Sequence, residues 1–223
     1  MDKKLLFQAL TKFFAGLLAV ALLVFLPAGT LRYWHGWLFL AVLFLPMTLL
    51  GAVLFVKSPE LLRKRLQTKE KEGEQKKVVA LSGVMFLFGF LLCGLNVRFG
   101  WFLLPKWASL LASAVFLLGY GLYAEVLREN AYLARTVEVQ SGQKLIDTGL
   151  YGVVRHPMYA ATVLMFLSMP LILGSAVSFV IFLAYPLILV RRIRNEEEVL
   201  SKGLGGYESY CQRVKYKMIP YIW

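Results

Sequence analysis

Residues 155–198 read RHPMYAATVLMFLSMPLILGSAVSFVIFLAYPLILVRRIRNEEE. About thirty apolar residues separate a polar group around His156 from a second polar group that ends in three glutamates, and Leu173-Gly174-Ser175 interrupt them near the middle. The hydrocarbon core of a bilayer is about 30 Å thick, so a stretch of this length that folds at the interruption crosses a membrane twice. The two polar groups would then lie side by side at one membrane face, where they predict a binding site.

The composition of the whole chain supports a membrane protein. Of its 223 residues, 59% are apolar, and the mean hydropathy of +0.64 is far above that of a typical soluble domain. The sequence therefore predicts an all-α integral membrane protein with about six transmembrane helices, of which the last two form a short helical hairpin. The apolar segments that support this count are 13–28, 34–56, 78–97, 107–127, 158–173 and 176–190.

The basic residues give the expected orientation. With six spans, all of the 25 lysines and arginines except Arg32, Arg98 and Lys106 fall on one side. Basic loops favour the cytoplasm, so both termini are expected there, in a bacterial inner membrane or an endoplasmic reticulum membrane. The net charge of +12 is then explained by topology and by attraction to anionic lipids, and a nucleic-acid partner is not expected.

The chain is expected to form one membrane domain with two regions. Residues 1–127 supply four spans that shape a lipid tunnel, and residues 128–223 supply the catalytic region. In the 57–77 loop, Ser58-Pro59-Glu60 predicts the start of a helix, either interfacial or merely solvated. Thr136–Gln140 predicts a strand or an extended stretch.

Several kinds of site are excluded by the sequence. Cys93 lies within a span and Cys211 in the tail, so neither a disulfide framework nor a metal site is expected. Gly119–Ala124 imitates a dinucleotide fingerprint, but no strand precedes it in its apolar span, and we reject it.

The two polar groups match a small zwitterionic ligand that carries an aromatic base and a sugar. Arginines pair with a carboxylate, and a glutamate accepts from an ammonium or a ribose hydroxyl. Tyr151 or Tyr159 can stack on a base or face a cation. S-adenosylmethionine has all of these parts.

A family resemblance adds to this interpretation. Gln143–Tyr159 (QKLIDTGLYGVVRHPMY), the following Glu196-Glu197 pair, and Gly205–Tyr210 with Ile219-Pro220 resemble the isoprenylcysteine carboxyl methyltransferase family over roughly residues 120–223. Sterol-type membrane reductases carry a string similar to Arg-His-Pro-x-Tyr. The tail departs from the pattern, since it is one residue short and has Leu204 in place of an aromatic residue.

The resemblance implies S-adenosyl-L-methionine in a cytoplasm-facing pocket and a lipophilic methyl acceptor that enters from the bilayer. Arg192 would meet the acceptor's polar head, and Glu197 and Tyr159 would complete the catalytic set as support residues or as a base. No metal is implied. The residues that would hold the cofactor are Gln143, Lys144, Leu145, Ile146, Tyr151, Arg155, His156 and Glu196.

Simpler interpretations of the same residues stay open. The arginines could serve only as topology anchors, His156 could cap a helix, and the glutamates could form a solvated helix face. The oligomeric state is not indicated.

The leading hypothesis is a membrane methyltransferase that uses S-adenosylmethionine on an isoprenoid- or lipid-linked carboxylate. The alternatives are an NADPH-dependent membrane reductase of a sterol-like or enone lipid, and a phospholipid N-methyltransferase. A transporter or scaffold is disfavoured, because the polar residues gather at a membrane face and not at mid-depth.

Overall fold

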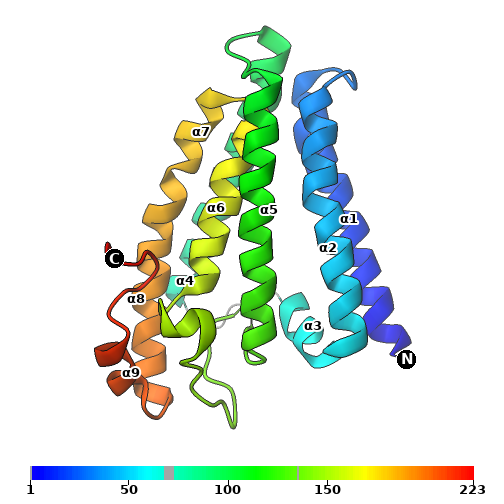
Figure 1. Cartoon of the computed structure of the whole chain (residues 1–223). Coiled ribbons are helices and arrows are strands. Elements are labelled where there is room, and N and C mark those ends of the chain that lie inside the picture. Colours follow the sequence, from blue (N-terminus) through cyan, green and yellow to red (C-terminus); the bar gives the residue numbers. More distant parts are fainter. Residues whose placement is uncertain (1, 68–72, 135) are drawn as a thin grey trace.

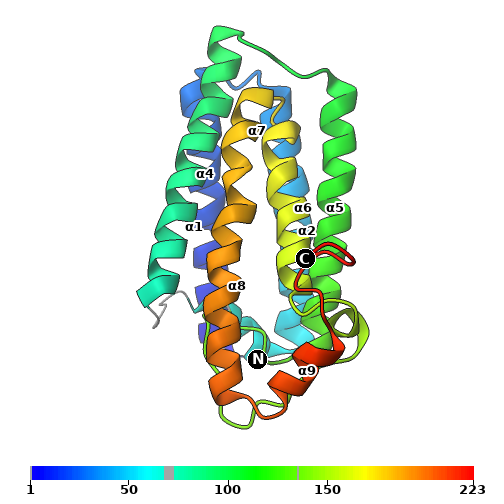
Figure 2. The same cartoon turned by 90° about the vertical axis from the view of Figure 1, so that its left-hand side faces the viewer.

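The computed structural model describes residues 2–67, 73–134 and 136–223, and these parts are helical with no β-strand. The long helices run along one common direction, as Figures 1 and 2 show. The all-α prediction is confirmed. The helices are α1 (Lys3–Ala28), α2 (Trp34–Lys57), α3 (Pro59–Leu66), α4 (Gly73–Phe99), α5 (Lys106–Glu129), α6 (Pro157–Ile172), α7 (Ala176–Phe182), α8 (Ala184–Gly203) and α9 (Tyr207–Arg213), with a 3₁₀ turn η1 (Gly149–Gly152).

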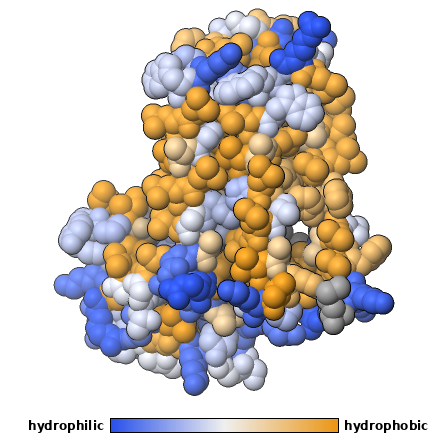
Figure 3. Space-filling model, turned by 45° about the vertical axis from the view of Figure 1, so that its right-hand side comes forward, coloured by the Kyte–Doolittle hydropathy of each residue, from blue (hydrophilic) through white to orange (hydrophobic). Residues whose placement is uncertain are grey.

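Among the described residues, five helical segments are long and apolar enough to cross a membrane: α1, α2, α4, α5 and the run Ala176–Gly203 that α7 and α8 form together. The fifth predicted span, 158–173, is α6, which has 16 residues and is about 24 Å long, shorter than a bilayer core. It pairs with α7 and α8 as the predicted helical hairpin. The chain is a multi-pass integral membrane protein, and Figure 3 shows the hydrophobic band between two hydrophilic ends.

The backbone around the hairpin turn at Leu173–Ser175 accepts hydrogen bonds from α5 and from the loops that precede α2 and α5. The Tyr33 hydroxyl donates to the Leu173 carbonyl, and Ser109 Oγ donates to the Leu171 carbonyl at 2.9 Å. The Leu104 amide donates to the Gly174 carbonyl at 2.9 Å. Backbone groups that leave a helix within lipid must be paired inside the protein, so these contacts allow the chain to reverse before α6 has crossed the full core.

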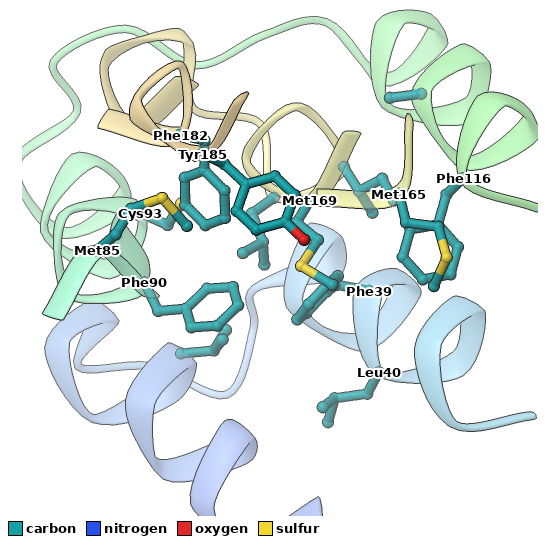
Figure 4. Close-up of a cluster of buried hydrophobic side chains, with 14 of the residues drawn as sticks. Phe39, Leu40, Met85, Phe90, Cys93, Phe116, Met165, Met169, Phe182 and Tyr185 are labelled. Atoms are coloured by element: carbon teal, nitrogen blue, oxygen red, sulfur yellow. The ribbon is translucent and has the colours of Figure 1, made fainter. Parts of the chain in front are cut away.

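The packed centre of the bundle is aromatic and sulfur-rich. Phe182 and Phe39 are fully buried, and Phe90, Met85 and Tyr185 lie beside them (Figure 4). These side chains come from α2, α4, α7 and α8. They join the two halves of the chain into one bundle.

Gly119 has a packing role in the contact between α5 and α6. A Cβ atom at this position would lie 3.0 Å from the Ala161 carbonyl oxygen and from the Leu164 and Met165 side chains. Only a glycine lets the two helices approach this closely without a shift. The glycine-containing string in α5 thus serves helix packing, in line with its rejection as a nucleotide motif.

Two predictions about the loops have different outcomes. The predicted helix after Ser58 is α3, with Pro59 at its first position and Leu61 and Leu62 buried. Thr136–Gln140 forms no strand and is irregular, because no neighbouring strand is present in the described part of the chain to pair with it. Residues 68–72, within the 57–77 loop, lie outside the described residues.

Candidate functional site

A pocket lies at the end of the bundle where α6 begins and α8 ends, under the loop that follows α5. Its cavity volume is about 100 Å³, below the roughly 300–1,000 Å³ of pockets that enclose a whole drug-sized ligand. The enclosed part therefore suits one end of a larger molecule, and the rest of that molecule would lie in the open mouth. Every lining residue falls between Asn130 and Tyr210.

Tyr159 forms the centre of the first polar cluster in the pocket. It is buried on the first turn of α6, and its hydroxyl donates to the Glu196 carboxylate. Arg192 Nε donates to the same hydroxyl oxygen at 2.9 Å. Arg192 and Glu196 are four residues apart on α8, which places them on one helix face. One phenol thus lies between a guanidinium and a carboxylate.

Glu197 points into a second cluster, which anchors the C-terminal tail. Its carboxylate accepts from Arg155 Nε at 2.9 Å and from Lys217 Nζ at 2.5 Å, and His156 Nε2 lies 3.3 Å away. Arg155 also donates to the carbonyls of Val214 and Lys215 at 2.7 and 2.9 Å. The cluster therefore joins the start of α6, the end of α8 and the tail.

The turn η1 holds Tyr151 in the pocket wall. Its first residue, Gly149, has φ +58°, and a Cβ there would lie 1.8 Å from Glu129 Oε1. The Glu129 carboxylate accepts from the Leu150 amide at 3.0 Å, which caps the turn. Asn130 Nδ2 then donates to the Tyr151 hydroxyl at 3.0 Å. Burial raises the pKa of Tyr151, so this phenol stays protonated at neutral pH.

Basic side chains of α3 hold the loop after α5 from outside. Lys64 Nζ donates to the Ala131 carbonyl at 3.3 Å, and Arg65 Nη1 donates to the Ala134 carbonyl at 3.1 Å. Arg65 also donates to the Tyr123 hydroxyl on α5. Since Ala134 lines the pocket, the N-terminal half of the chain helps to shape it.

The structure brings the predicted site residues together, with one exception. Glu197 does not line the pocket, because its carboxylate is turned toward the tail. Lys144 is exposed at the mouth. The predicted residues that line the pocket are Gln143, Lys144, Leu145, Ile146, Tyr151, Arg155, His156, Tyr159, Arg192 and Glu196.

Sequence reasoning missed several lining residues. Asn130, Tyr132 and Glu138 come from the loop before the conspicuous motif, and Tyr207 and Tyr210 come from α9. The string Gly205–Tyr210 was noted only for the family resemblance. Its two tyrosines, three residues apart on a short helix, were the available signal that one face is directed inward.

Comparisons with known proteins give two results. The model of the Ergosterol biosynthesis ERG4/ERG24 family matches residues 127–223. A Delta(14)-sterol reductase of Mus musculus is 34% identical over 91 residues, which are 40% of this chain and 22% of that protein. A Delta(14)-sterol reductase of Schizosaccharomyces pombe is 29% identical over 90 residues, which are 39% of this chain and 21% of that protein. The chain thus spans well under half the length of these relatives.

The second result concerns the fold. The solved structure of the eukaryotic intramembrane Ras methyltransferase ICMT (isoprenylcysteine carboxyl methyltransferase) matches with a TM-score of 0.59 and 21% identity. The match covers 96% of this chain and 77% of that one. At this identity the likeness shows a shared fold and nothing about the reaction.

These findings correct the predicted function. The family match and the curated relatives lead to sterol reductases, which overturns the prediction of a methyltransferase with S-adenosylmethionine as cofactor. The physical reason is that both classes carry the Arg-His-Pro-x-Tyr string, here Arg155–Tyr159, at the start of a membrane helix. The string therefore located the pocket but could not discriminate between the two cofactors.

Proposed function

We propose that the chain is a membrane reductase that uses NADPH to reduce a carbon–carbon double bond in a sterol-like lipid. One observation supports this best: residues 127–223, which match the sterol reductase family, include every residue that lines the pocket. The similarity thus covers the binding site itself, and not only the membrane helices around it.

The residues of the pocket fit a nicotinamide nucleotide. Tyr207 lines the pocket, and its buried hydroxyl has no oxygen or nitrogen hydrogen-bond partner in the described part of the chain, so a ligand could accept from it. Lys144 at the mouth can pair with a phosphate, and the amide-bearing Gln143 lies beside it. The enclosed 100 Å³ would take one end of the cofactor, with the remainder in the mouth.

Reduction of a double bond adds a hydride to one carbon and a proton to the other, and NADPH when bound supplies the hydride. The chain must supply the proton. Tyr159 is placed for this role, because its hydroxyl lies in the pocket and the Arg192 guanidinium beside its oxygen stabilises the phenolate that proton donation leaves. Glu196, which accepts from Tyr159, can take up a proton from water and pass it to the phenolate, which restores Tyr159 for the next turnover.

The lipid would enter from the bilayer side of the pocket. Pro157 and Met158 give the wall an apolar part at the start of α6, and this helix packs against α5 in the membrane bundle. The helices before residue 127 would surround the lipid body. By the basic-residue pattern the pocket faces the cytoplasm, in a bacterial inner membrane or the endoplasmic reticulum.

The proposal is tested by product analysis. Purified protein in nanodiscs is given NADPH deuterated at the transferable position, together with a panel of sterols that carry conjugated double bonds or an enone. A product heavier than its substrate by one hydrogen and one deuterium supports the proposal. Absence of deuterium in every product, with a methyl group gained from added S-adenosylmethionine, would overturn it.

A variant pair tests the cofactor site in the same assay. Lys144→Ala should raise the KM for NADPH about tenfold, because a phosphate loses its cationic partner. Lys202→Ala is the matched control, since Lys202 is exposed at the end of α8 and outside this pocket. Equal KM values for both variants would remove Lys144 from the site.

A further inference from the structure

Tyr207 carries a buried hydroxyl that has no oxygen or nitrogen partner in the described residues, and the Cys211 thiol, a weak hydrogen-bonding group, lies beside it. The residue is 3% exposed, it lines the pocket, and its Oη has no hydrogen-bond partner there. Buried polar groups in proteins are nearly always paired, and an unpaired one destabilises the fold. A hydroxyl of this kind on a residue that lines a pocket favours a partner that arrives with a ligand.

The tyrosine ring is held so that the hydroxyl cannot turn away to water. Gly206, with φ +82°, turns the chain into α9 directly before it. The ring packs in an apolar cluster with Leu204, Tyr210 and Val214. The nearby Cys211 thiol is only a weak hydrogen-bonding group. The hydroxyl is therefore kept in place before any ligand binds, which lowers the entropy cost of binding.

The surroundings define the hydrogen-bonding role of this hydroxyl. Burial raises the pKa of Tyr207, and the neighbouring Glu197 carboxylate acts in the same direction, so the group keeps its proton and can donate. The Glu196 carboxylate also lies on this side of the pocket. Negative charge nearby disfavours a phosphate and favours an uncharged oxygen as the acceptor.

We infer that Tyr207 is a cofactor-binding residue whose hydroxyl donates to an uncharged oxygen of the nicotinamide half of the bound nucleotide, either the carboxamide carbonyl or a hydroxyl of the nicotinamide ribose. The inference rests on the proposed function for the identity of the nucleotide. It assigns the two ends of the cofactor: the oxygen-rich, uncharged part lies near α9, and the phosphates lie toward Lys144 at the mouth.

The first test compares stability without ligand. Tyr207→Phe should melt at the same temperature as the wild type or higher, because the change removes an unpaired buried hydroxyl. Tyr210→Phe is the matched control: the Tyr210 hydroxyl donates to the Tyr151 carbonyl at 2.8 Å, so its loss should lower the melting temperature. A ligand-free Tyr207→Phe protein that melts lower than the wild type would overturn the inference.

The second test measures binding by calorimetry. Tyr207→Phe should weaken NADPH binding roughly threefold to tenfold, the loss of one neutral hydrogen bond. Binding of adenosine 2′,5′-bisphosphate, which carries only the phosphorylated adenosine half, should be unchanged. Unchanged NADPH binding by the variant, or equal weakening of both ligands, would overturn the inference.

Failure of the proposed function and failure of the Tyr207 inference give different binding results. A wild-type protein that does not bind NADPH would contradict the proposed function and this assignment to NADPH, whatever Tyr207 does. If the wild type binds NADPH and Tyr207→Phe binds it equally tightly, the proposed function stands. That result contradicts only the inference about Tyr207.

Discussion

Replacing Glu197 with glutamine should destabilise the protein by about 3 kcal/mol. Removing one partner of a buried ion pair costs about 3–5 kcal/mol, because the remaining charge stays buried. Arg155, whose side chain is 8% exposed, would lose its charged partner and keep only neutral acceptors, whereas Lys217 at 25% can turn toward water. These two features place the expected loss at the low end of that range.

Thermal denaturation of the detergent-solubilised protein measures this effect. For a chain of this length, about 3 kcal/mol corresponds to a melting temperature lower by about 6–12 °C. Glu198→Gln is the matched control, because Glu198 is exposed and should change the stability by less than about 0.5 kcal/mol.

The same variant separates the two roles considered for Glu197. The structure places its carboxylate between α6, α8 and the tail, outside the pocket lining. A structural role predicts lost stability together with a proportionate loss of cofactor affinity. A Glu197→Gln protein that melts like the wild type but turns over at least a hundredfold more slowly would refute this reasoning and restore the catalytic interpretation.

Three further substitutions test other parts of the account. In steady-state kinetics, Tyr159→Phe should lower kcat of the reductase reaction about 100- to 10,000-fold with little change in KM for NADPH. A kcat within threefold of the wild type would show that Tyr159 is not the acid. Gly149→Ala should lower the free energy of unfolding by about 2–3 kcal/mol, because φ +58° disfavours alanine and the new Cβ displaces the Glu129 cap. An unchanged denaturation midpoint would contradict the turn geometry. Tyr33→Phe should lower the free energy of unfolding by about 1–3 kcal/mol in the same assay, because it leaves the Leu173 carbonyl unpaired. An unchanged stability would show that another donor pairs with this carbonyl.

The helical architecture could be predicted because lipid demands long apolar helices. The first five predicted apolar segments each coincide with a helix of the structure, and the segment 176–190 covers α7 and the first part of α8. The predicted break at Leu173–Ser175 separates α6 from α7. The count of full-length spans was less certain from sequence. The partners that let α6 end early, such as Tyr33 and Ser109, lie far away in the chain and carry no periodic signal.

The site was predictable to the extent that its residues are polar and next to apolar helices. Arg192, Glu196 and Tyr159 do meet in one cluster, as expected from two polar groups at the ends of a hairpin. Glu197 could not be distinguished from Glu196 by sequence alone, since adjacent residues on a helix point about 100° apart and only packing decides which one faces the pocket. Tyr207 was missed because its orientation depends on the turn at Gly206.

The reaction type could not be predicted from the motif. Arg155–Tyr159 builds the entrance to α6 through backbone contacts with the tail: the amides of Arg155 and His156 donate to the carbonyls of Tyr216 and Lys217. Such contacts serve the fold and are independent of which nucleotide binds. In our proposal the selection of a cofactor depends on residues outside this string, among them Lys144 and Tyr207.

The central claim is the identity of the cofactor, and its most direct test is calorimetric titration of the purified protein in nanodiscs with NADPH and, separately, with S-adenosylmethionine. The account predicts binding of NADPH, weakened in Lys144→Ala, and no heat from S-adenosylmethionine. Saturable binding of S-adenosylmethionine with none of NADPH would contradict it.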